Sequence, residues 1–306
     1  MCNLTPRKAR RSHLRWPVGL AALLLMSLGG CQTSREGTIK SAIETRQAWW
    51  HYTDSFSHLL IRHTDNPDSD VLHVYIEGDG KPWIKHRYIA KDPSPENPLA
   101  LHLMMRDPQN SLYLGRPCYF TRYRSGDTGD NTSCHPAFWT SARYSEQVVE
   151  SMVATLEAYI EMNAYSKVVL IGYSGGGTIA YLMAGKTDRV DRVVTVAANL
   201  DHGAWTHYHD YSPLRDSLEP IATDIPRTIS QLHLRGGRDR NVPEKVLKKF
   251  MVDEKARWVT IPDYDHVCCW EKNWRNILDA FVVDTFVDTF VDTHASDPNV
   301  AGSGEP

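Results

Sequence analysis

The chain has 306 residues, of which 42% are hydrophobic and 23% are charged, and its formal net charge is −3. This composition excludes a disordered or fibrous protein, and the length is enough for a large buried core. We therefore expect one α/β domain of about 270 residues rather than two small domains.

The first 30 residues differ from the rest of the chain. Five Lys and Arg residues precede an apolar run over residues 16–28, and no acidic residue occurs in this segment. This pattern is typical of a secretory signal peptide. The run ends in Leu28-Gly29-Gly30-Cys31, which resembles the bacterial lipobox. The resemblance implies cleavage before Cys31 and attachment of acyl chains to it. The alternatives are an ordinary signal peptide with an incidental cysteine, or an uncleaved anchor.

Removal of residues 1–30 leaves 29 Lys and Arg against 37 Asp and Glu, a formal charge of −8. An acidic mature protein is not expected to bind nucleic acid. Gln32 follows the cysteine, and by resemblance to enterobacterial sorting this favours the outer membrane, facing the periplasm. The membrane is thus one expected partner, through the N-terminal lipid.

The mature chain divides into three parts by composition. Residues 31–54 are expected to form a tether and a polar lead-in, residues 55–293 the folded domain, and residues 294–306 a disordered tail.

The first half of this domain contains both strand and helix patterns. Residues 56–63 and 71–76 are expected to be strands. The stretch 78–140 contains seven prolines, so we expect a long loop-rich segment with one helix near 99–106. Apolar residues at helical spacing predict an amphipathic helix over 145–164.

Four cysteines remain besides Cys31, in a compartment where disulfides persist. They allow three pairings. We favour Cys118 with Cys134, since both lie in a polar, turn-forming stretch. Cys268 and Cys269 could pair with each other or stay reduced. A metal site is not expected, because the chain lacks CxxC and HExxH spacings.

The segment Gly172-Tyr173-Ser174-Gly175-Gly176 is a GxSxG pentad. A β-branched run at 167–171 predicts a buried strand before it, and residues 178–184 predict a helix after it. Strand, tight glycine turn and helix are typical of the nucleophile elbow of α/β-hydrolases. Ser174 is therefore the candidate nucleophile.

Strands and helices alternate through the rest of the domain. Strands are expected at 193–197, 231–234 and 258–261, with helical patterns at 243–251 and 271–290. Alternation of this kind predicts a mainly parallel sheet with right-handed crossovers, flanked by helices.

A serine hydroxyl needs a base to take its proton and a carboxylate to orient that base. Gly236-Gly237-Arg238-Asp239 follows a predicted strand and resembles the acid loop of α/β-hydrolases, so Asp239 is the candidate acid. His266 follows the next strand and is the candidate base. Asp201 is the rival acid, because it follows an earlier strand.

The developing oxyanion needs two donors, usually backbone amides. Gly175 would supply one amide, and Asp79, or failing it Gly80, the other, with Glu77 in the place of the histidine of esterase loops. We expect the Asp79 side chain to point away from the oxyanion. Further candidate pocket residues are Gly80, Tyr173, Asp201 and His202.

Six stretches of the chain together resemble a group of bacterial lipoproteins of the α/β-hydrolase fold. They are residues 75–80, 139–143, 172–177, 199–202, 236–239 and 266–270. The resemblance spans about residues 70–275. It implies an α/β-hydrolase fold and a serine hydrolase that cleaves an ester or related acyl bond of a small molecule through an acyl-enzyme, without a cofactor. It implies no particular substrate and no oligomeric state.

Two other functions share these residues. One is a non-catalytic binding or scaffolding lipoprotein of the cell envelope, because a fold alone does not establish activity. The other is an acyltransferase that uses the same triad.

Overall fold

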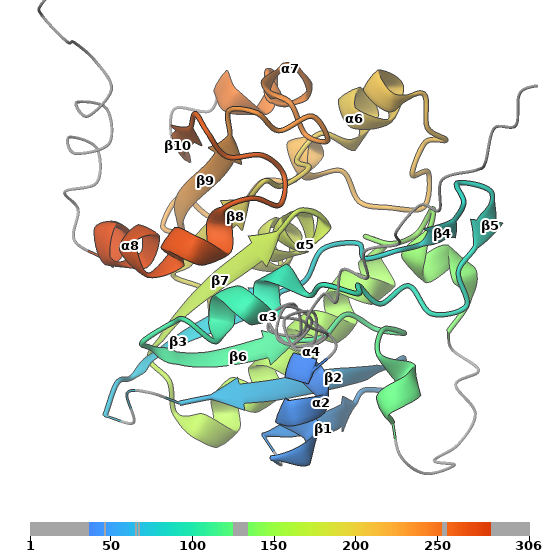
Figure 1. The fold of residues 1–306 in the computed structure, drawn as a ribbon. Helices are drawn as coiled ribbons and strands as arrows, with labels where there is room; N and C mark the ends of the chain where they lie inside the picture. The colour runs from blue at the N-terminus through green and yellow to red at the C-terminus, as the bar shows by residue number, and fades with distance from the viewer. Residues whose placement is uncertain are drawn as a thin grey trace, which may run out of the picture. The chain divides into compact units, whose positions relative to one another are not determined.

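The described part of the chain is built on one large β-sheet. The computed structural model describes residues 37–282 except 46, 65, 67, 125–133 and 253–255. Eight strands pair in the order β1-β2-β6-β3-β7-β8-β9-β10 (Figure 1). They are β1 (Ala48–Tyr52), β2 (Ser57–His63), β3 (Val71–Ile76), β6 (Asn110–Leu114), β7 (Lys167–Tyr173), β8 (Arg192–Val196), β9 (Ser230–Gly236) and β10 (Ala256–Ile261).

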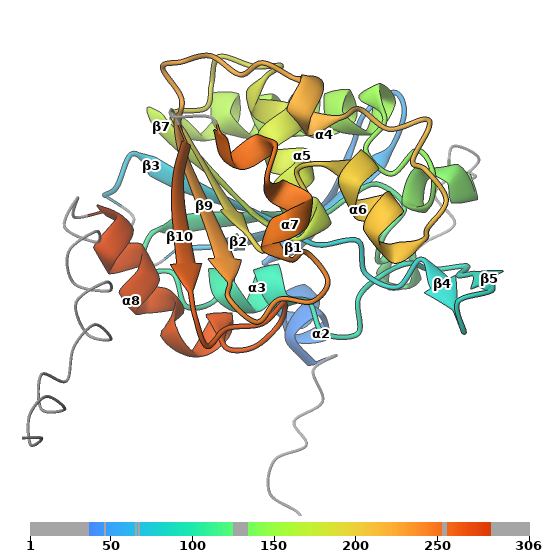
Figure 2. The same ribbon diagram turned by 90° about the horizontal axis from the view of Figure 1, so that it is seen from above.

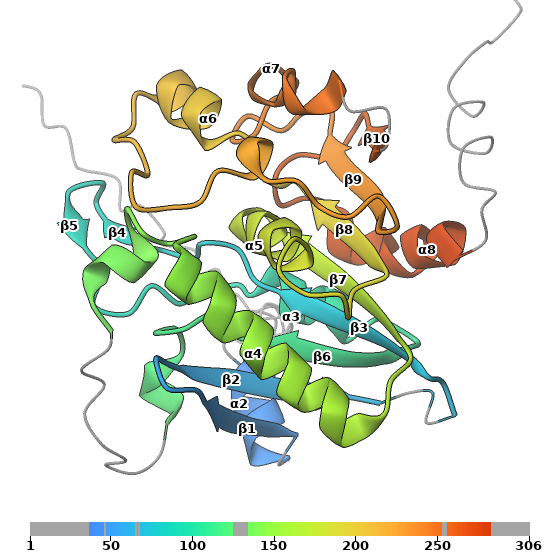
Figure 3. The ribbon, with the colours of Figure 1, turned by 180° about the vertical axis from the view of Figure 1, so that it is seen from behind.

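Strand direction divides the sheet into two parts. In the part β6-β3-β7-β8-β9-β10, all neighbouring strands run parallel. At one edge, β2 pairs antiparallel with β6, and β1 pairs antiparallel with β2. A parallel sheet is covered on both faces. Helices α4 (Glu146–Asn163) and α5 (Gly175–Ala184) lie on one face, and α3 (Leu99–Met104) and α8 (Trp270–Val282) on the other (Figures 2 and 3). Because parallel strands share a direction, their carboxyl ends meet at one edge, where ligands bind in such sheets.

Local signals set the ends of the long helix α4. The Ser145 side chain accepts a hydrogen bond from the Val148 amide and caps the first turn. Ala164 ends the helix in the left-handed conformation with φ 51°. The helix therefore has nearly the bounds that its apolar spacing predicts.

Helix α8 is fixed to the core by its tryptophans. Trp270, Trp274 and Leu278 are buried at helical spacing. The Trp274 Nε1 group also donates a hydrogen bond of 2.9 Å to the Tyr75 hydroxyl on β3. Since α8 begins four residues after His266, this packing also holds the end of the loop that joins β10 to α8.

Besides four 3-10 helices, at Thr121–Tyr123, Pro136–Trp139, Pro220–Ala222 and Phe250–Val252, the remaining α-helices and strands of the described ranges are short. They are α2 (Gly37–Glu44), α6 (His202–His209), α7 (Glu244–Leu247), and a two-stranded hairpin of β4 (Trp83–Ile84) and β5 (Tyr88–Ile89). Within the described ranges, no helix combines the length and apolarity that a bilayer crossing requires.

Most of the predicted elements are confirmed. The strands expected at 71–76, 167–171, 193–197, 231–234 and 258–261 are present as β3, β7, β8, β9 and β10. The helix expected over 271–290 is observed as α8 up to Val282. Cys31, the signal peptide and the tail at 294–306 lie outside the described residues.

Two segments of the structure differ from the expected organisation. The lead-in at 31–54 contains α2 and β1, and β1 pairs with β2 along its whole length, so the packed domain begins earlier than residue 55. The loop-rich stretch 78–140 hides β6, which is fully buried between β2 and β3. Its polar first residues concealed it; in the fold, the Asn110 side chain donates to the Ser69 carbonyl at 3.0 Å.

Candidate active site

Ser174 lies at a sharp turn between β7 and α5. Its φ is 50° and its ψ is −123°, a conformation that costs free energy for a residue with a side chain. A Cβ on Gly172 would lie 2.2 Å from the Gly176 carbonyl oxygen, and a Cβ on Gly176 would lie 2.2 Å from the Ile76 oxygen. The glycines are thus required for helix, turn and neighbouring strand to approach this closely.

The structure brings the three predicted triad residues together. His266 Nε2 lies 3.0 Å from Ser174 Oγ, and His266 Nδ1 lies 2.8 Å from Asp239 Oδ2. The other oxygen of Asp239 accepts the amides of Asn241 and Val242, each at 2.8 Å. The carboxylate is fully buried, whereas the His266 side chain is 18% exposed. The acid is therefore fixed, and the histidine faces the space where a substrate would bind.

Asn241 is a site residue that the sequence analysis missed. Its Nδ2 group lies 3.0 Å from His266 Nε2, beside the Ser174 hydroxyl. It comes two residues after Asp239 on the acid loop, and no motif marked its side chain. In a neutral imidazole with its proton on Nδ1, the single lone pair of Nε2 would be shared between the Ser174 hydroxyl and the Asn241 amide group.

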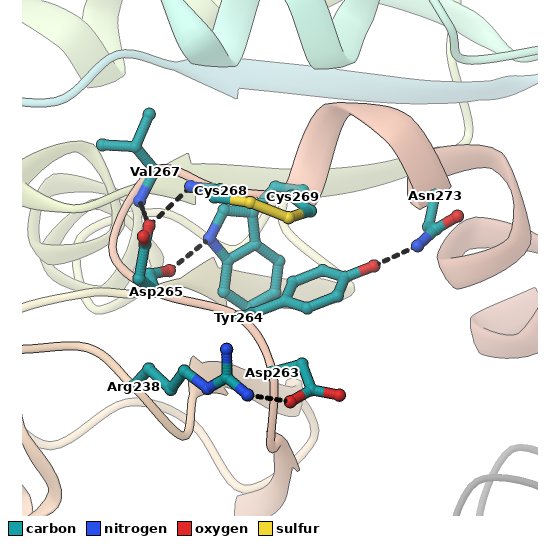
Figure 4. Close-up of a disulfide and its surroundings, with 9 residues drawn as sticks. Arg238, Asp263, Tyr264, Asp265, Val267, Cys268, Cys269 and Asn273 are labelled. Carbon is teal, nitrogen blue, oxygen red and sulfur yellow. Dashed lines mark hydrogen bonds and ion pairs between the residues drawn. A yellow bond between two sulfur atoms is a disulfide. The ribbon is translucent and has the colours of Figure 1, made fainter.

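The loop that carries His266 is held by its own hydrogen bonds (Figure 4). The Asp265 carboxylate accepts the amides of Val267 at 2.8 Å and Cys268 at 2.6 Å. These amides hold the pKa of Asp265 below its ordinary value. The Trp270 Nε1 group donates to the Asp265 carbonyl at 3.1 Å. The base is thus placed by a turn that the ionised aspartate stabilises.

Both disulfide questions have an answer in the structure. Cys118 is joined to Cys134 across 16 residues of sequence. Cys268 is joined to its neighbour Cys269 (Figure 4), the alternative that the sequence left open. The second bridge follows His266 by two residues and so belongs to the same loop.

The two predicted oxyanion donors are the backbone amides of Asp79 and Gly175. Within the described ranges, the backbone amides of Asp79 and Gly175 donate no hydrogen bond. Gly175 opens α5, where the amide has no partner inside the helix. Gly80 has a φ of +62°, and a Cβ there would lie 2.1 Å from the Pro93 oxygen, so its role is to shape the turn.

The Asp79 carboxylate was expected to point away from the oxyanion site, but it lies next to Gly175. A Cβ built on Gly175 would lie 2.2 Å from Asp79 Oδ1. The carboxylate is held by Arg116 at 2.6 Å, Arg143 at 3.0 Å and the Tyr144 hydroxyl at 2.6 Å. Burial by itself would raise the pKa of Asp79, but Arg143 and Arg116 outweigh burial and hold this pKa well below its usual range. The two guanidinium groups thus balance its charge.

Glu77 supports the same turn from inside the core. Its carboxylate accepts the Gly78 amide and the Ala100 amide, both at 3.1 Å. Burial nevertheless raises the pKa of Glu77 to about 7. The residue that replaces the expected histidine is therefore structural, and it ties the turn to α3.

Two of the four other pocket candidates lie elsewhere. Asp201 caps α6, and its Oδ1 accepts the Ala204 amide at 2.7 Å. His202 is buried and stacked on Tyr144 at 4.7 Å between ring centres, and burial lowers its pKa to about 3. Gly80 and Tyr173 do line the cavity over Ser174.

The cavity at this site measures about 860 Å³. It opens over Ser174 and His266 and combines polar groups with aromatic side chains. Trp83, Trp205 and Tyr211 contribute the large rings. Trp139 is buried, and its Nε1 group donates a hydrogen bond to the Ala90 carbonyl.

A second serine–histidine hydrogen bond lies in the core. His58 Nε2 is 2.7 Å from Ser151 Oγ, and His58 Nδ1 is 2.9 Å from the Gly115 carbonyl oxygen. The pair faces no carboxylate among the described residues, and burial lowers the pKa of His58 to about 4. It therefore has a structural role.

Part of the chain and its fold are similar to known proteins. The model of the dienelactone hydrolase family matches residues 117–255, less than half of the chain, which include Ser174 and Asp239 but not His266. A candidate aryl esterase from Burkholderia cenocepacia has a similar structure, with a TM-score of 0.50 at 13% identity over 78% of this chain and 99% of that one. An α/β serine hydrolase without lid from Xanthomonas campestris gives a TM-score of 0.49 at 12% identity over 76% and 90%. No curated protein matches the sequence significantly.

The sheet order and the Burkholderia structure show that the chain has the α/β-hydrolase fold. The predicted fold class is thereby confirmed. The family match supports hydrolase activity for the part of the chain that it covers.

Proposed function

We propose that this protein is a serine hydrolase that cleaves carboxylic esters through an acyl-enzyme. The observation that carries the proposal is the hydrogen-bonded series Ser174, His266, Asp239, of which the first two residues line a cavity of about 860 Å³. A hydroxyl, an imidazole and a buried carboxylate in this order are what nucleophilic acyl transfer requires.

Each group would have one task in the reaction. Ser174 Oγ attacks the ester carbonyl while His266 Nε2 takes its proton. The amides of Asp79 and Gly175 would bind the resulting oxyanion. Collapse breaks the bond to the alcohol, which leaves with the proton from His266. Water then attacks the acyl-enzyme with the same base, and the acid is released with Ser174 restored.

The substrate class is a small-molecule ester with a short acyl chain. The cavity is lined by polar groups as well as aromatic rings, which supports esters with some polarity over bulk triglyceride. Screening p-nitrophenyl esters of increasing chain length would rank the acyl groups.

The decisive test uses two serine variants. Ser174→Ala should abolish labelling by a fluorophosphonate probe and lower kcat by about 10⁴-fold or more. Ser151→Ala, which removes the serine of the buried pair with His58, should keep both the labelling and the wild-type kcat. Activity and labelling that persist in Ser174→Ala would contradict the proposal. A wild type that neither reacts with the probe nor turns over any ester would instead favour a non-catalytic role.

We also propose that Cys31 carries the lipid that anchors the mature chain in the outer membrane. The lipobox and the basic, apolar N-terminal segment support it. Metabolic labelling with a palmitate analogue should mark the wild type and not Cys31→Ser. Labelling of both chains would contradict the assignment.

A further inference from the structure

The hairpin of β4 and β5 exposes apolar side chains on both of its faces. Trp83 pairs with Ile89 and Ile84 pairs with Tyr88, so the first pair lies on one face and the second pair on the other. Their exposed fractions are 41%, 43%, 44% and 58%. Figures 1 and 2 show the hairpin at the periphery of the fold. A two-stranded hairpin of this kind is poorly stabilised in water alone.

The tip of the hairpin has a strained backbone. Lys85 and His86 both have φ 53°, and the Arg87 amide bonds the Ile84 carbonyl at 3.2 Å. This turn normally takes Asn and Gly, because a left-handed residue with a larger side chain costs about 1–2 kcal/mol. Such an outlier is most often kept for a function.

The hairpin is also strongly basic. Residues 81–91 include four Lys and Arg residues and no acidic residue, in a chain whose mature part has a formal charge of −8. Lys81 is paired with Glu96. Within the described ranges, Lys85, Arg87 and Lys91 form no ion pair with a carboxylate. These cations are therefore available to an anionic partner.

We propose that this hairpin docks on the surface of a bilayer that contains anionic lipid. A protein partner would cover one face of the hairpin, whereas the headgroup layer surrounds a hairpin that enters it. Trp and Tyr side chains favour that layer, and each Lys or Arg is attracted to anionic headgroups. The acidic remainder of the chain is repelled by the same surface, so charge selects this face for docking.

Docking would bring the cavity to the membrane. Lys81, Trp83 and His86 belong both to the hairpin region and to the rim of the cavity over Ser174. Only five residues lie between the proposed lipid site Cys31 and Gly37, the first described residue, so the two can be at most about 20 Å apart along an extended chain. A tether this short is consistent with a domain that rests on the bilayer.

The test measures contact with lipid and needs no turnover. The full mature chain is incorporated into vesicles of brominated phosphatidylcholine, with and without brominated phosphatidylglycerol, and quenching of tryptophan fluorescence is recorded. The mature chain has eight tryptophans, so the vesicles that contain phosphatidylglycerol should quench about one eighth of the wild-type fluorescence if all contribute equally, and Trp83→Phe should lose most of that quenching. Trp258→Phe is the matched control, because Trp258 is half-buried on the edge strand β10, and it should keep the quenching.

A second pair of variants tests the charge. Lys85→Glu with Arg87→Glu should lose most of the quenching, whereas Lys248→Glu with Lys249→Glu, which changes the same charge at another exposed place, should not. Equal quenching of the wild type and Trp83→Phe would overturn the proposal. Equal quenching with and without phosphatidylglycerol would overturn the requirement for anionic lipid. Cross-linking of two chains through the hairpin would overturn the proposal that a bilayer is the partner. Since no substrate is present, these outcomes are independent of whether Ser174 is a nucleophile.

Discussion

Hydrogen bonds distinguish the two aspartates that could serve His266. Asp239 Oδ2 lies 2.8 Å from the imidazole, and its other oxygen is fixed by two amides. Asp201 is occupied at the N-terminus of α6. A carboxylate that is already oriented loses little entropy when it holds the imidazole in one tautomer.

Replacement of these aspartates separates their roles. Asp239→Asn should lower kcat by about 10⁴-fold, because an amide would stabilise the wrong tautomer of His266. Asp201→Asn should leave kcat nearly unchanged, since Asn caps a helix as well as Asp. The measurement is steady-state hydrolysis of a p-nitrophenyl ester. The reverse ranking would make Asp201 the acid.

Glu77 makes stability depend on pH. Its pKa is raised from 4.5 to about 7 by burial, so between these values the folded chain keeps a proton that the unfolded chain releases. The free energy of unfolding should therefore fall as pH rises from about 4.5 to 7, by about 3 kcal/mol in total from this residue. Urea unfolding at pH 5 and pH 8 should show a smaller fall for Glu77→Gln than for the wild type. Glu150→Gln, at an exposed position, should match the wild type; an unchanged fall in Glu77→Gln would refute the linkage.

The strand, turn and helix around Ser174 act as one element. Gly172, Ser174 and Gly176 each occupy a backbone position that the neighbouring elements leave almost no room to alter. The turn was predictable from sequence because the glycines and the serine that it needs lie within five consecutive residues, 172–176. The hairpin of β4 and β5 was not, because its apolar residues resemble core residues until the fold leaves them uncovered.

The close approach at Gly172 gives a stability test. Gly172→Ala would place a Cβ 2.2 Å from a backbone oxygen, and we expect it to lower the free energy of unfolding by at least about 3 kcal/mol. Gly37→Ala is the matched control, since nothing lies within 4 Å of its Cβ position. It should be neutral or slightly stabilising. Urea titration of both variants makes the comparison, and equal midpoints would contradict the packing described.

At the scale of the whole molecule, the parallel sheet gathers its functional loops at one edge. Ser174 follows β7, Asp239 follows β9, His266 follows β10, and the proposed oxyanion turn follows β3. The disulfide between Cys118 and Cys134 closes a loop next to Arg116, which holds Asp79. Covalent closure of such a loop restricts the unfolded chain more than the folded one.

Removal of this bridge should be costly. Cys118→Ser with Cys134→Ser should lower the free energy of unfolding by about 3 kcal/mol, because the unfolded chain regains the entropy of the open loop. Chemical denaturation of the two chains at the same pH measures the difference. A loss near zero would show that the bridge is absent or does not constrain the unfolded state.

The sequence by itself determined five strands of the parallel sheet, the elbow, and the candidates Ser174, Asp239 and His266 in this chain order, with Asp201 left as the rival acid. These depend on apolar periodicity and on glycines and loops adjacent in the chain, and the physics of both is local. Only the tertiary structure decided the insertion of β6, the cluster of Arg116, Arg143 and Tyr144 around Asp79, and the uncovered hairpin. A buried charge takes its partners from segments that chain closure brings together, and exposure is known only when all other segments are in place.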